Sequence, residues 1–164
     1  MSRLFSRRRM IGAGGAVAVS PMLLARSVSA ATDPSGPLTV LNTPLRLYDS
    51  RVDMTPLGGA KLETGSSVIV TASAGDSGIL MAAFVNVTVT QTEGRGFLRL
   101  TGSDLSGEQP AAETSNINWL SSGQTIGNMA LTTVGGENGI EVFAGGAGRT
   151  HVIVDLMGYI PFVT

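Results

Sequence analysis

The sequence predicts an all-β protein, a single antiparallel β-sandwich or barrel-like domain of about nine strands. Apolar and polar residues alternate most clearly over 84–90, where Val85, Val87 and Val89 lie on one side of an extended chain. Similar segments recur at short intervals with glycine-rich turns between them, and no convincing amphipathic helix follows residue 30. Short strands spaced in this way favour an antiparallel sandwich or barrel.

The predicted strands follow one another from residue 38 onward. The segment 152–156, V-I-V-D-L, is apolar on both faces except at Asp155, which indicates a central strand of a sheet. The other segments combine apolar residues with polar ones and end at turn-forming residues. In chain order the predicted strands are 38–41, 45–49, 67–71, 84–90, 97–101, 115–120, 125–134, 140–144 and 150–159.

Glycine-rich segments at 94–96, 135–139 and 145–148 separate the later strands. Tight hairpins often need a positive φ, which glycine adopts without steric cost, so we expect these segments to be hairpin turns. The longest segment without a predicted strand is 102–114, which is polar and rich in acidic residues. We expect it to be a solvated loop that is available for binding.

Residues 1–30 have the pattern of a twin-arginine signal peptide. Ser6, Arg7 and Arg8 precede an uncharged, glycine-interrupted run from Met10 to Ala25, which is shorter than the roughly 20 apolar residues of a membrane span. Small side chains over 28–30 predict cleavage after Ala30. We therefore expect export by the twin-arginine translocase to the cell envelope or the exterior, no stable membrane span, a linker over 31–37 and one β-domain over 38–164.

Charge and cysteine content limit the partners of the processed chain. Five of the eleven basic residues lie within residues 1–30, so residues 31–164 carry six basic and twelve acidic residues, a net charge of −6. This balance disfavours nucleic acid, which rewards clustered lysine and arginine. The chain has no cysteine, so burial and sheet hydrogen bonds must hold the domain without disulfides.

Catalytic and metal-binding residues are scarce. His151 is the only histidine, and Asp155 follows it at a distance of about 13 Å along a strand, too far for a hydrogen bond between the two side chains. No nucleophile motif such as G-x-S-x-G is present, and one histidine without cysteine makes a zinc site improbable. We expect no catalytic residue and no cofactor. Acidic residues that offer oxygen ligands for calcium, although solubility explains them better, are Asp49, Asp53, Asp104, Glu108 and Glu113.

Several polar side chains interrupt otherwise apolar strands. Buried amides and charges are costly unless they are paired, so we expect these side chains to form a hydrogen-bonded network, with Asp49, Arg51 and Asp155 as its ionic part. A polar ligand pocket is the alternative role. Exposed aromatic platforms for sugars are few, and Trp119 is the main candidate. The full set of polar residues is Asp49, Arg51, Asn86, Asn116, Asn118, Asn128 and Asp155.

Residues 31–164 contain a series of short motifs in a specific order. They are R-L-Y-D-S-R (46–51), V-N-V-T-V-T (85–90), G-F-L-R-L (96–100), S-N-I-N-W (115–119), G-Q-T-I-G-N (123–128) and H-V-I-V-D-L-M-G-Y-I (151–160). In these motifs the segment resembles a β-domain that is common in secreted and cell-surface actinobacterial proteins. The resemblance covers essentially this whole segment, with Ser50 where threonine is commoner and Gly127 where alanine is commoner. It implies a module of surface proteins, often a companion of cell-wall hydrolases, and implies no catalytic residue.

We therefore expect an exported, non-enzymatic surface or cell-wall-associated domain with a structural, assembly or interaction role. Its partners would be cell-wall components, a second copy of itself or another surface protein. Two alternatives stay open at this point. A glycan-binding module would use Trp119 for stacking, and a cell-wall hydrolase would depend on His151.

Overall fold

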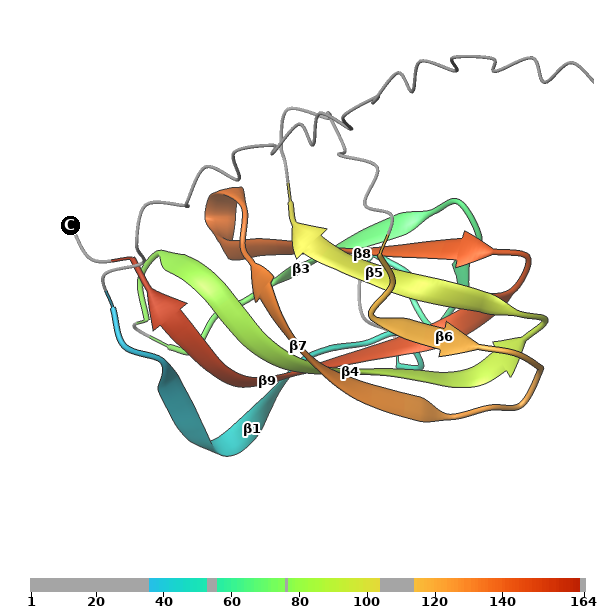
Figure 1. Ribbon diagram of the computed structural model, residues 1–164, viewed down its shortest axis with the longest axis horizontal. Coiled ribbons are helices and arrows are strands. Elements are labelled where there is room, and N and C mark those ends of the chain that lie inside the picture. The colour runs from blue at the N-terminus through green and yellow to red at the C-terminus, as the bar shows by residue number, and fades with distance from the viewer. Residues whose placement is uncertain (1–35, 53–55, 76, 104–113, 163–164) are drawn as a thin grey trace, which may run out of the picture. The chain divides into compact units, whose positions relative to one another are not determined.

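The computed structural model describes residues 36–52, 56–75, 77–103 and 114–162, and residues Ala31–Thr164 form one compact unit. The predicted signal peptide, its cleavage site after Ala30 and most of the predicted linker lie outside the described residues. The described part is built from strands, with one short 3₁₀ turn, η1 (Gly136–Asn138) (Figure 1). The prediction of an all-β domain of about nine strands is confirmed.

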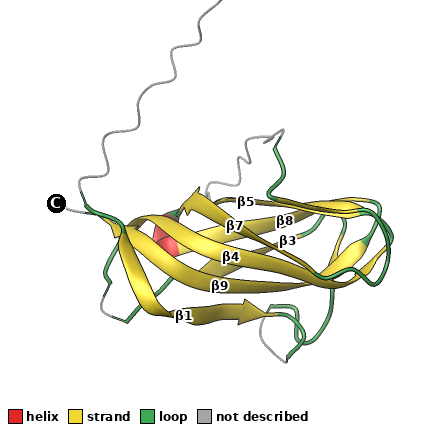
Figure 2. Cartoon of the chain, turned by 60° about the horizontal axis from the view of Figure 1, so that its bottom comes forward, coloured by secondary structure: helices red, strands yellow, loops and turns green. Residues whose placement is uncertain are grey.

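Two antiparallel sheets pack face to face and make a β-sandwich (Figure 2). The first, sheet A, has the order β1-β9-β4-β7, with β2 pairing to the early part of β9, and the second, sheet B, has the order β3-β8-β5-β6. The strands are β1 (Thr39–Asp49), β2 (Leu62–Glu63), β3 (Ser67–Thr71), β4 (Leu80–Glu93), β5 (Gly96–Gly102), β6 (Ile117–Trp119), β7 (Ile126–Thr133), β8 (Gly139–Gly146) and β9 (Arg149–Pro161).

The first strand differs from its prediction. The two segments predicted at 38–41 and 45–49 form one long strand, β1, whose register against β9 shifts between Val40 and Leu45. Pro44 lies in this shift, and it is tolerated because β1 is at the edge of sheet A, where a missing N–H breaks no ladder. The sequence does not predict β2, because a two-residue strand is too short to show any periodicity.

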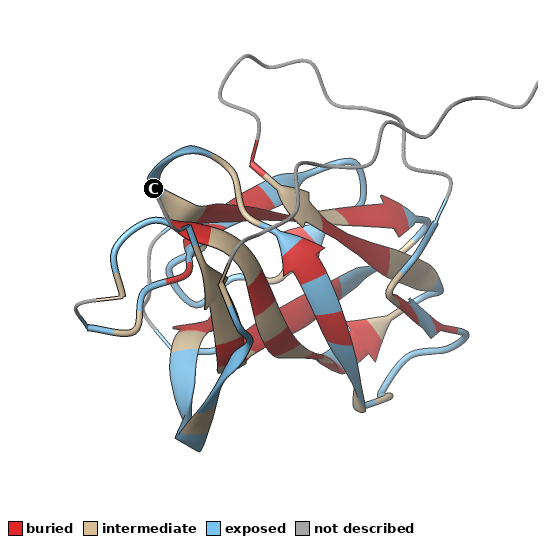
Figure 3. Ribbon diagram, turned by 60° about the vertical axis from the view of Figure 1, so that its left-hand side comes forward, coloured by how far each residue is buried: buried red, intermediate tan, exposed pale blue. Residues whose placement is uncertain are grey.

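The core lies between the sheets and follows the alternation seen in the sequence. Val85, Val87 and Val89 are fully buried on β4, and V-I-V-D-L lies in β9, between β1 and β4, as predicted for a central strand. Figure 3 shows buried and exposed stretches alternating along the strands. Both sheets contribute to the core cluster, which runs from Tyr48 to Leu156 along the described chain.

The glycine-rich turns are not hairpins, and this part of the prediction is wrong. The turns after β4 and after β8 each carry the chain from one sheet to the other, because β4 and β9 belong to sheet A while β5 and β8 belong to sheet B. The crossings lie side by side, with Glu93 opposite Arg149 and Gly96 opposite Gly146.

Close approach explains several of these glycines better than a positive φ does. A Cβ on Gly148 would lie 2.1 Å from the carbonyl oxygen of Glu93, and one on Gly96 would lie 2.4 Å from the Trp119 ring. Gly94 and Gly146 do have positive φ angles, of 63° and 101°. In the turn before β8 the positive φ angles belong to Glu137 and Asn138 instead.

No helix in the described ranges is both long enough and apolar enough to cross a membrane.

Candidate functional site

An ionic cluster lies on the outer face of sheet A, where β1 ends beside β9. Asp49 accepts hydrogen bonds from the Arg51 side chain at 2.9 Å and 2.6 Å and from the Arg51 backbone N–H at 3.1 Å. The Arg46 guanidinium donates to Asp49 at 2.9 Å and also forms an ion pair with Asp155. Arg46 therefore joins two acidic residues that the sequence analysis placed in one network.

The electrostatics of Asp49 follow from these contacts. The hydrogen bond from the Arg51 side chain is the largest cause that lowers the pKa of Asp49 to about 2, and Arg46 adds to the effect, while burial opposes it. The side chain of Asp49 is 7% exposed, whereas those of Arg46 and Arg51 are 46% and 42% exposed. Solvent screens the arginines, so the cluster stabilises the end of β1 only modestly.

Replacing Asp49 with asparagine is expected to lower the free energy of unfolding by about 1–2 kcal/mol at pH 7, because two arginines lose a charged acceptor. A carboxyl whose pKa is depressed on folding stabilises above its unfolded pKa and loses this effect as the pH falls through its folded value. The difference in the free energy of unfolding between the native protein and Asp49→Asn should therefore be largest above about pH 5 and should vanish as the pH falls toward 2. Urea unfolding across this range measures it.

Exposed Glu137, on η1, provides the matched control for that experiment. Glu137→Gln removes one carboxylate from the surface but leaves Asp49 with both arginines. We expect the urea concentration at the unfolding midpoint of Glu137→Gln to differ little from that of the native protein at pH 7. If the loss of unfolding free energy in Asp49→Asn stays constant down to pH 2, the role assigned to the Asp49 carboxylate is wrong.

The structure brings Ser50 to His151, next to the ionic cluster. The Ser50 hydroxyl lies 3.1 Å from His151 Nδ1 and accepts a hydrogen bond of 2.9 Å from the Val152 N–H. The Ser50 backbone N–H also donates to the Val152 carbonyl, at 2.9 Å. Ser50 is fully buried, and burial is the main cause that lowers the pKa of His151. The pair fastens the end of β1 to β9, and its hydroxyl has no exposure through which to attack a substrate.

The asparagines do not converge on one pocket. Asn86 pairs in register with Asp155 and donates to Thr88 at 3.4 Å, so it lies beside the ionic cluster. Asn128 lies on β7, at the edge of sheet A opposite to β1, where its Nδ2 donates to the Asn116 carbonyl and links β7 to the segment before β6. Asn118 donates to Ser115 and is exposed. The polar residues thus form separate local networks that tie strand ends and turns together.

Trp119 lies in the core. It is 1% exposed, so its ring offers no platform to a sugar, and the version of the glycan-binding alternative that depends on Trp119 stacking fails. Its indole N–H has no hydrogen-bond partner in the part of the chain that the structure describes. The ring packs against Gly96, which has no side chain to displace it.

Residues considered for calcium are mostly beyond the described ranges. Asp53, Asp104, Glu108 and Glu113 lie outside them, and the Asp49 oxygens are bonded to arginines. Within 36–52, 56–75, 77–103 and 114–162, no group of three or more His, Asp or Glu side chains is arranged to hold a metal ion.

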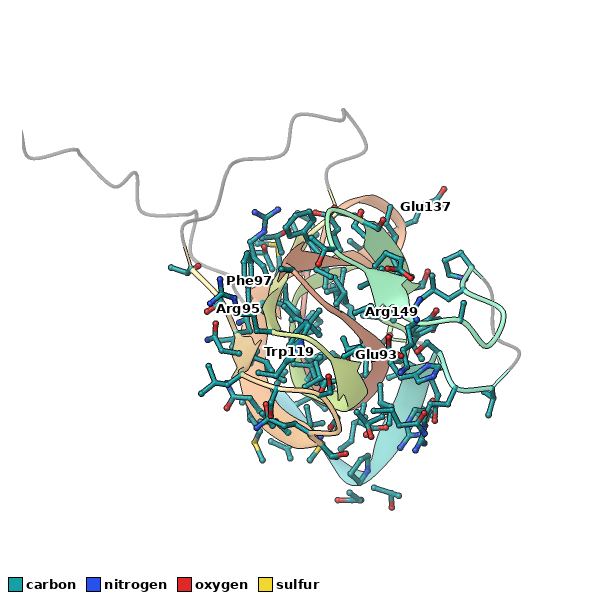
Figure 4. All side chains as sticks on the ribbon, turned by 90° about the vertical axis from the view of Figure 1, so that its right-hand side faces the viewer. Glu93, Arg95, Phe97, Trp119, Glu137 and Arg149 are labelled. Atoms are coloured by element: carbon teal, nitrogen blue, oxygen red, sulfur yellow. The ribbon has the colours of Figure 1, made fainter. Side chains whose placement is uncertain are left out.

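A second ionic cluster closes the end of the sandwich where the two sheet crossings meet. Glu93 forms ion pairs of 2.6 Å with both Lys61 and Arg149, and Arg149 also reaches Glu63 at 3.1 Å. Glu93 and Arg149 lie side by side in Figure 4. A shallow hollow of about 390 Å³ lies beside them, and a larger one of about 640 Å³ lies between β1 and β3.

The outer face of sheet A is apolar over the half that the ionic cluster leaves free. Residues opposite each other in antiparallel strands share a face, and one row across the sheet consists of Leu131, Phe84, Gly158 and Val40. Met129 lies in the next row, and Ile160 lies opposite Ala82 on the far side of Phe84. Val40, Met129 and Leu131 are 65%, 56% and 61% exposed. We call Val40, Phe84, Met129, Leu131 and Ile160 the apolar face.

Sequence reasoning missed Arg46 and Ser50. Both belong to the motif R-L-Y-D-S-R, and Arg46 is a charged residue in the same predicted strand as Asp49, which was a usable signal. The contact between Ser50 and His151 joins residues 101 positions apart, and only strand pairing reveals it.

No protein-family model and no curated protein matches this sequence.

Proposed function

We propose that the chain is an exported, non-enzymatic module of the cell surface or cell wall with a structural or assembly role. The observation that carries this proposal is the apolar face, on which large side chains are exposed on β1 and β7 and half-buried on β4 and β9. Exposed apolar patches of this kind mark interaction sites in soluble proteins. The predicted signal peptide and the resemblance to surface domains agree with that role.

The state of the polar residues supports an interaction role over a catalytic one. Asp49, Arg51 and Asp155 are engaged with one another or with Arg46, and Ser50 and His151 engage each other. Side chains held in this way support the sheet that displays the apolar face. The free energy of binding would then come from burial of the apolar side chains around Phe84.

The proposal is tested by using residues 31–164 as bait on intact cell envelopes. We expect specific capture of the module or of a surface component, weakened severalfold by Val40→Glu, because a charge on the apolar face must be desolvated on contact. The readout is the amount retained after washing, together with the identity of what is retained.

Leu120→Glu is the matched control, since Leu120 is 82% exposed and lies after β6, away from the apolar face. It should leave capture unchanged. If the native module captures nothing and is strictly monomeric, the proposed function is wrong. If Leu120→Glu weakens capture as much as Val40→Glu, the apolar face does not carry it.

A further inference from the structure

Strand β7 leaves one edge of sheet A open. In the described part of the chain, β7 pairs in register with β4 alone and is the last strand of its sheet. An unpaired strand edge presents a row of N–H and C=O groups that can pair with another strand. The opposite edge of the sheet, β1, is protected against such pairing by Pro44, by two register shifts and by the charged Arg46.

The hydrogen-bond pattern identifies the groups at the open edge. The Val134 N–H donates to the Met81 carbonyl at 3.3 Å, which makes Ala82 and Thr133 a pair without mutual hydrogen bonds. Because the two kinds of pair alternate, Leu131, Met129 and Gly127 also direct their backbone N–H and C=O away from β4. These groups therefore point to the open edge of β7.

The sequence of β7 contains none of the residues that usually prevent an edge strand from pairing with another strand. Residues Ile126–Thr133 read I-G-N-M-A-L-T-T, with no charged residue and no proline. Met129 and Leu131 also expose their side chains on the apolar face. Residues 31–164 carry a net charge of −6, so two copies repel each other least where they meet along an uncharged strand.

The spacing within β7 is complementary to itself. In an antiparallel pair of two β7 strands with the two-fold axis at Met129, Gly127 of each copy lies opposite Leu131 of the other. Glycine leaves room for the leucine on the outer face, and the backbone groups of these three residues pair with each other. The apolar faces of the two copies become continuous.

We propose that β7 pairs antiparallel with β7 of a second copy, with Met129 on the two-fold axis, and so joins the two copies of sheet A into one continuous sheet. This inference rests on the proposed assembly function and names its partner, a second copy of the chain. Sheet B has two edge strands, but β6 has only three residues, and β3 has five residues and one large exposed apolar side chain, Ile69.

Cysteine scanning tests the register, because the chain has no cysteine of its own. Opposite residues in a hydrogen-bonded antiparallel pair have Cα atoms about 5.5 Å apart, within the range of a disulfide. Under mild oxidation Met129→Cys should form a covalent dimer. Gly127→Cys and Leu131→Cys should each stay monomeric alone and form a mixed dimer when combined. Ile69→Cys, on β3, is the control and should stay monomeric.

A charge substitution tests the same contact without oxidation. Met129→Lys should raise the dissociation constant of the dimer roughly tenfold or more, since the two lysines would lie directly opposite each other at the two-fold axis. Ile69→Lys, at 52% exposure, should leave it unchanged. Sedimentation of residues 31–164 in the micromolar range gives the constants, and thermal unfolding verifies that both variants fold.

The outcomes separate this inference from the proposed function. Envelope capture by a protein that stays monomeric, or that cross-links through Ile69→Cys and not through Met129→Cys, overturns pairing through β7 and leaves the surface role in place. If the protein captures nothing and is strictly monomeric, both the pairing through β7 and the proposed function are wrong.

Discussion

Replacing Gly148 with alanine should lower the free energy of unfolding by about 3 kcal/mol, because the new methyl group has no space. A Cβ at this position would lie 2.1 Å from the Glu93 carbonyl oxygen and 3.0 Å from the backbone oxygen of Arg95. Both neighbours are backbone atoms of the other sheet crossing. Neither can rotate away, so the two crossings must separate or the strands must shift.

Urea unfolding followed by the fluorescence of Trp119, the single tryptophan, measures this effect. Gly123→Ala is the control, because Gly123 has a φ of +79° and a methyl group added there would have no neighbouring atom within 4 Å. Its cost should be about 1–2 kcal/mol, from backbone conformation alone. If Gly148→Ala costs no more than Gly123→Ala, close packing of the crossings is not the reason for Gly148.

Replacing Trp119 with alanine should cost about 3–5 kcal/mol, the range expected when a large buried aromatic side chain is removed from a core. The ring is 1% exposed and packs against Gly96, at the start of β5. Its removal leaves a cavity between strands whose backbones are fixed by pairing, so the surroundings can collapse only partly. Circular dichroism in urea provides the measurement, since the fluorescent probe is lost.

Trp119→Phe distinguishes packing from the indole N–H. That N–H is buried and has no partner among the described residues, so phenylalanine loses ring volume but no hydrogen bond seen there. We expect it to cost clearly less than Trp119→Ala. An unchanged unfolding midpoint for Trp119→Ala, with lost binding to cell wall, would instead place Trp119 at a binding surface and contradict its burial.

Local patterns in the sequence were sufficient for much of the sheet structure. The alternation over 84–90 identified the inward valines of β4, because a strand buried on one face has an apolar residue at every second position. The run V-I-V-D-L identified β9 as a central strand, because a strand buried on both faces is apolar at nearly every position. The ranges predicted for β3 and β5 agree with the structure to within a residue at each end. Such signals depend only on which side of a strand faces the core.

The candidate site was less accessible to sequence reasoning. Asp49, Arg51 and Asp155 were selected because charged residues in apolar strands need partners, but the residue that joins Asp49 to Asp155 is Arg46. The asparagines that looked similar in sequence lie in separate local networks. Which polar side chains come into contact depends on the order of the strands in the sheets, and no local sequence pattern indicates that order.

By itself, then, the sequence determined the all-β class, the approximate number of strands and the inward residues of the central ones, because these follow from short-range periodicity. Only the tertiary structure decided that the glycine-rich turns cross between sheets, that Trp119 is core, that Ser50 meets His151 and that β7 pairs with β4 alone among the described strands. These properties depend on contacts between residues far apart in the chain, such as Glu93 with Gly148 or Ser50 with His151. Pairing and packing establish such contacts, and no local pattern records them.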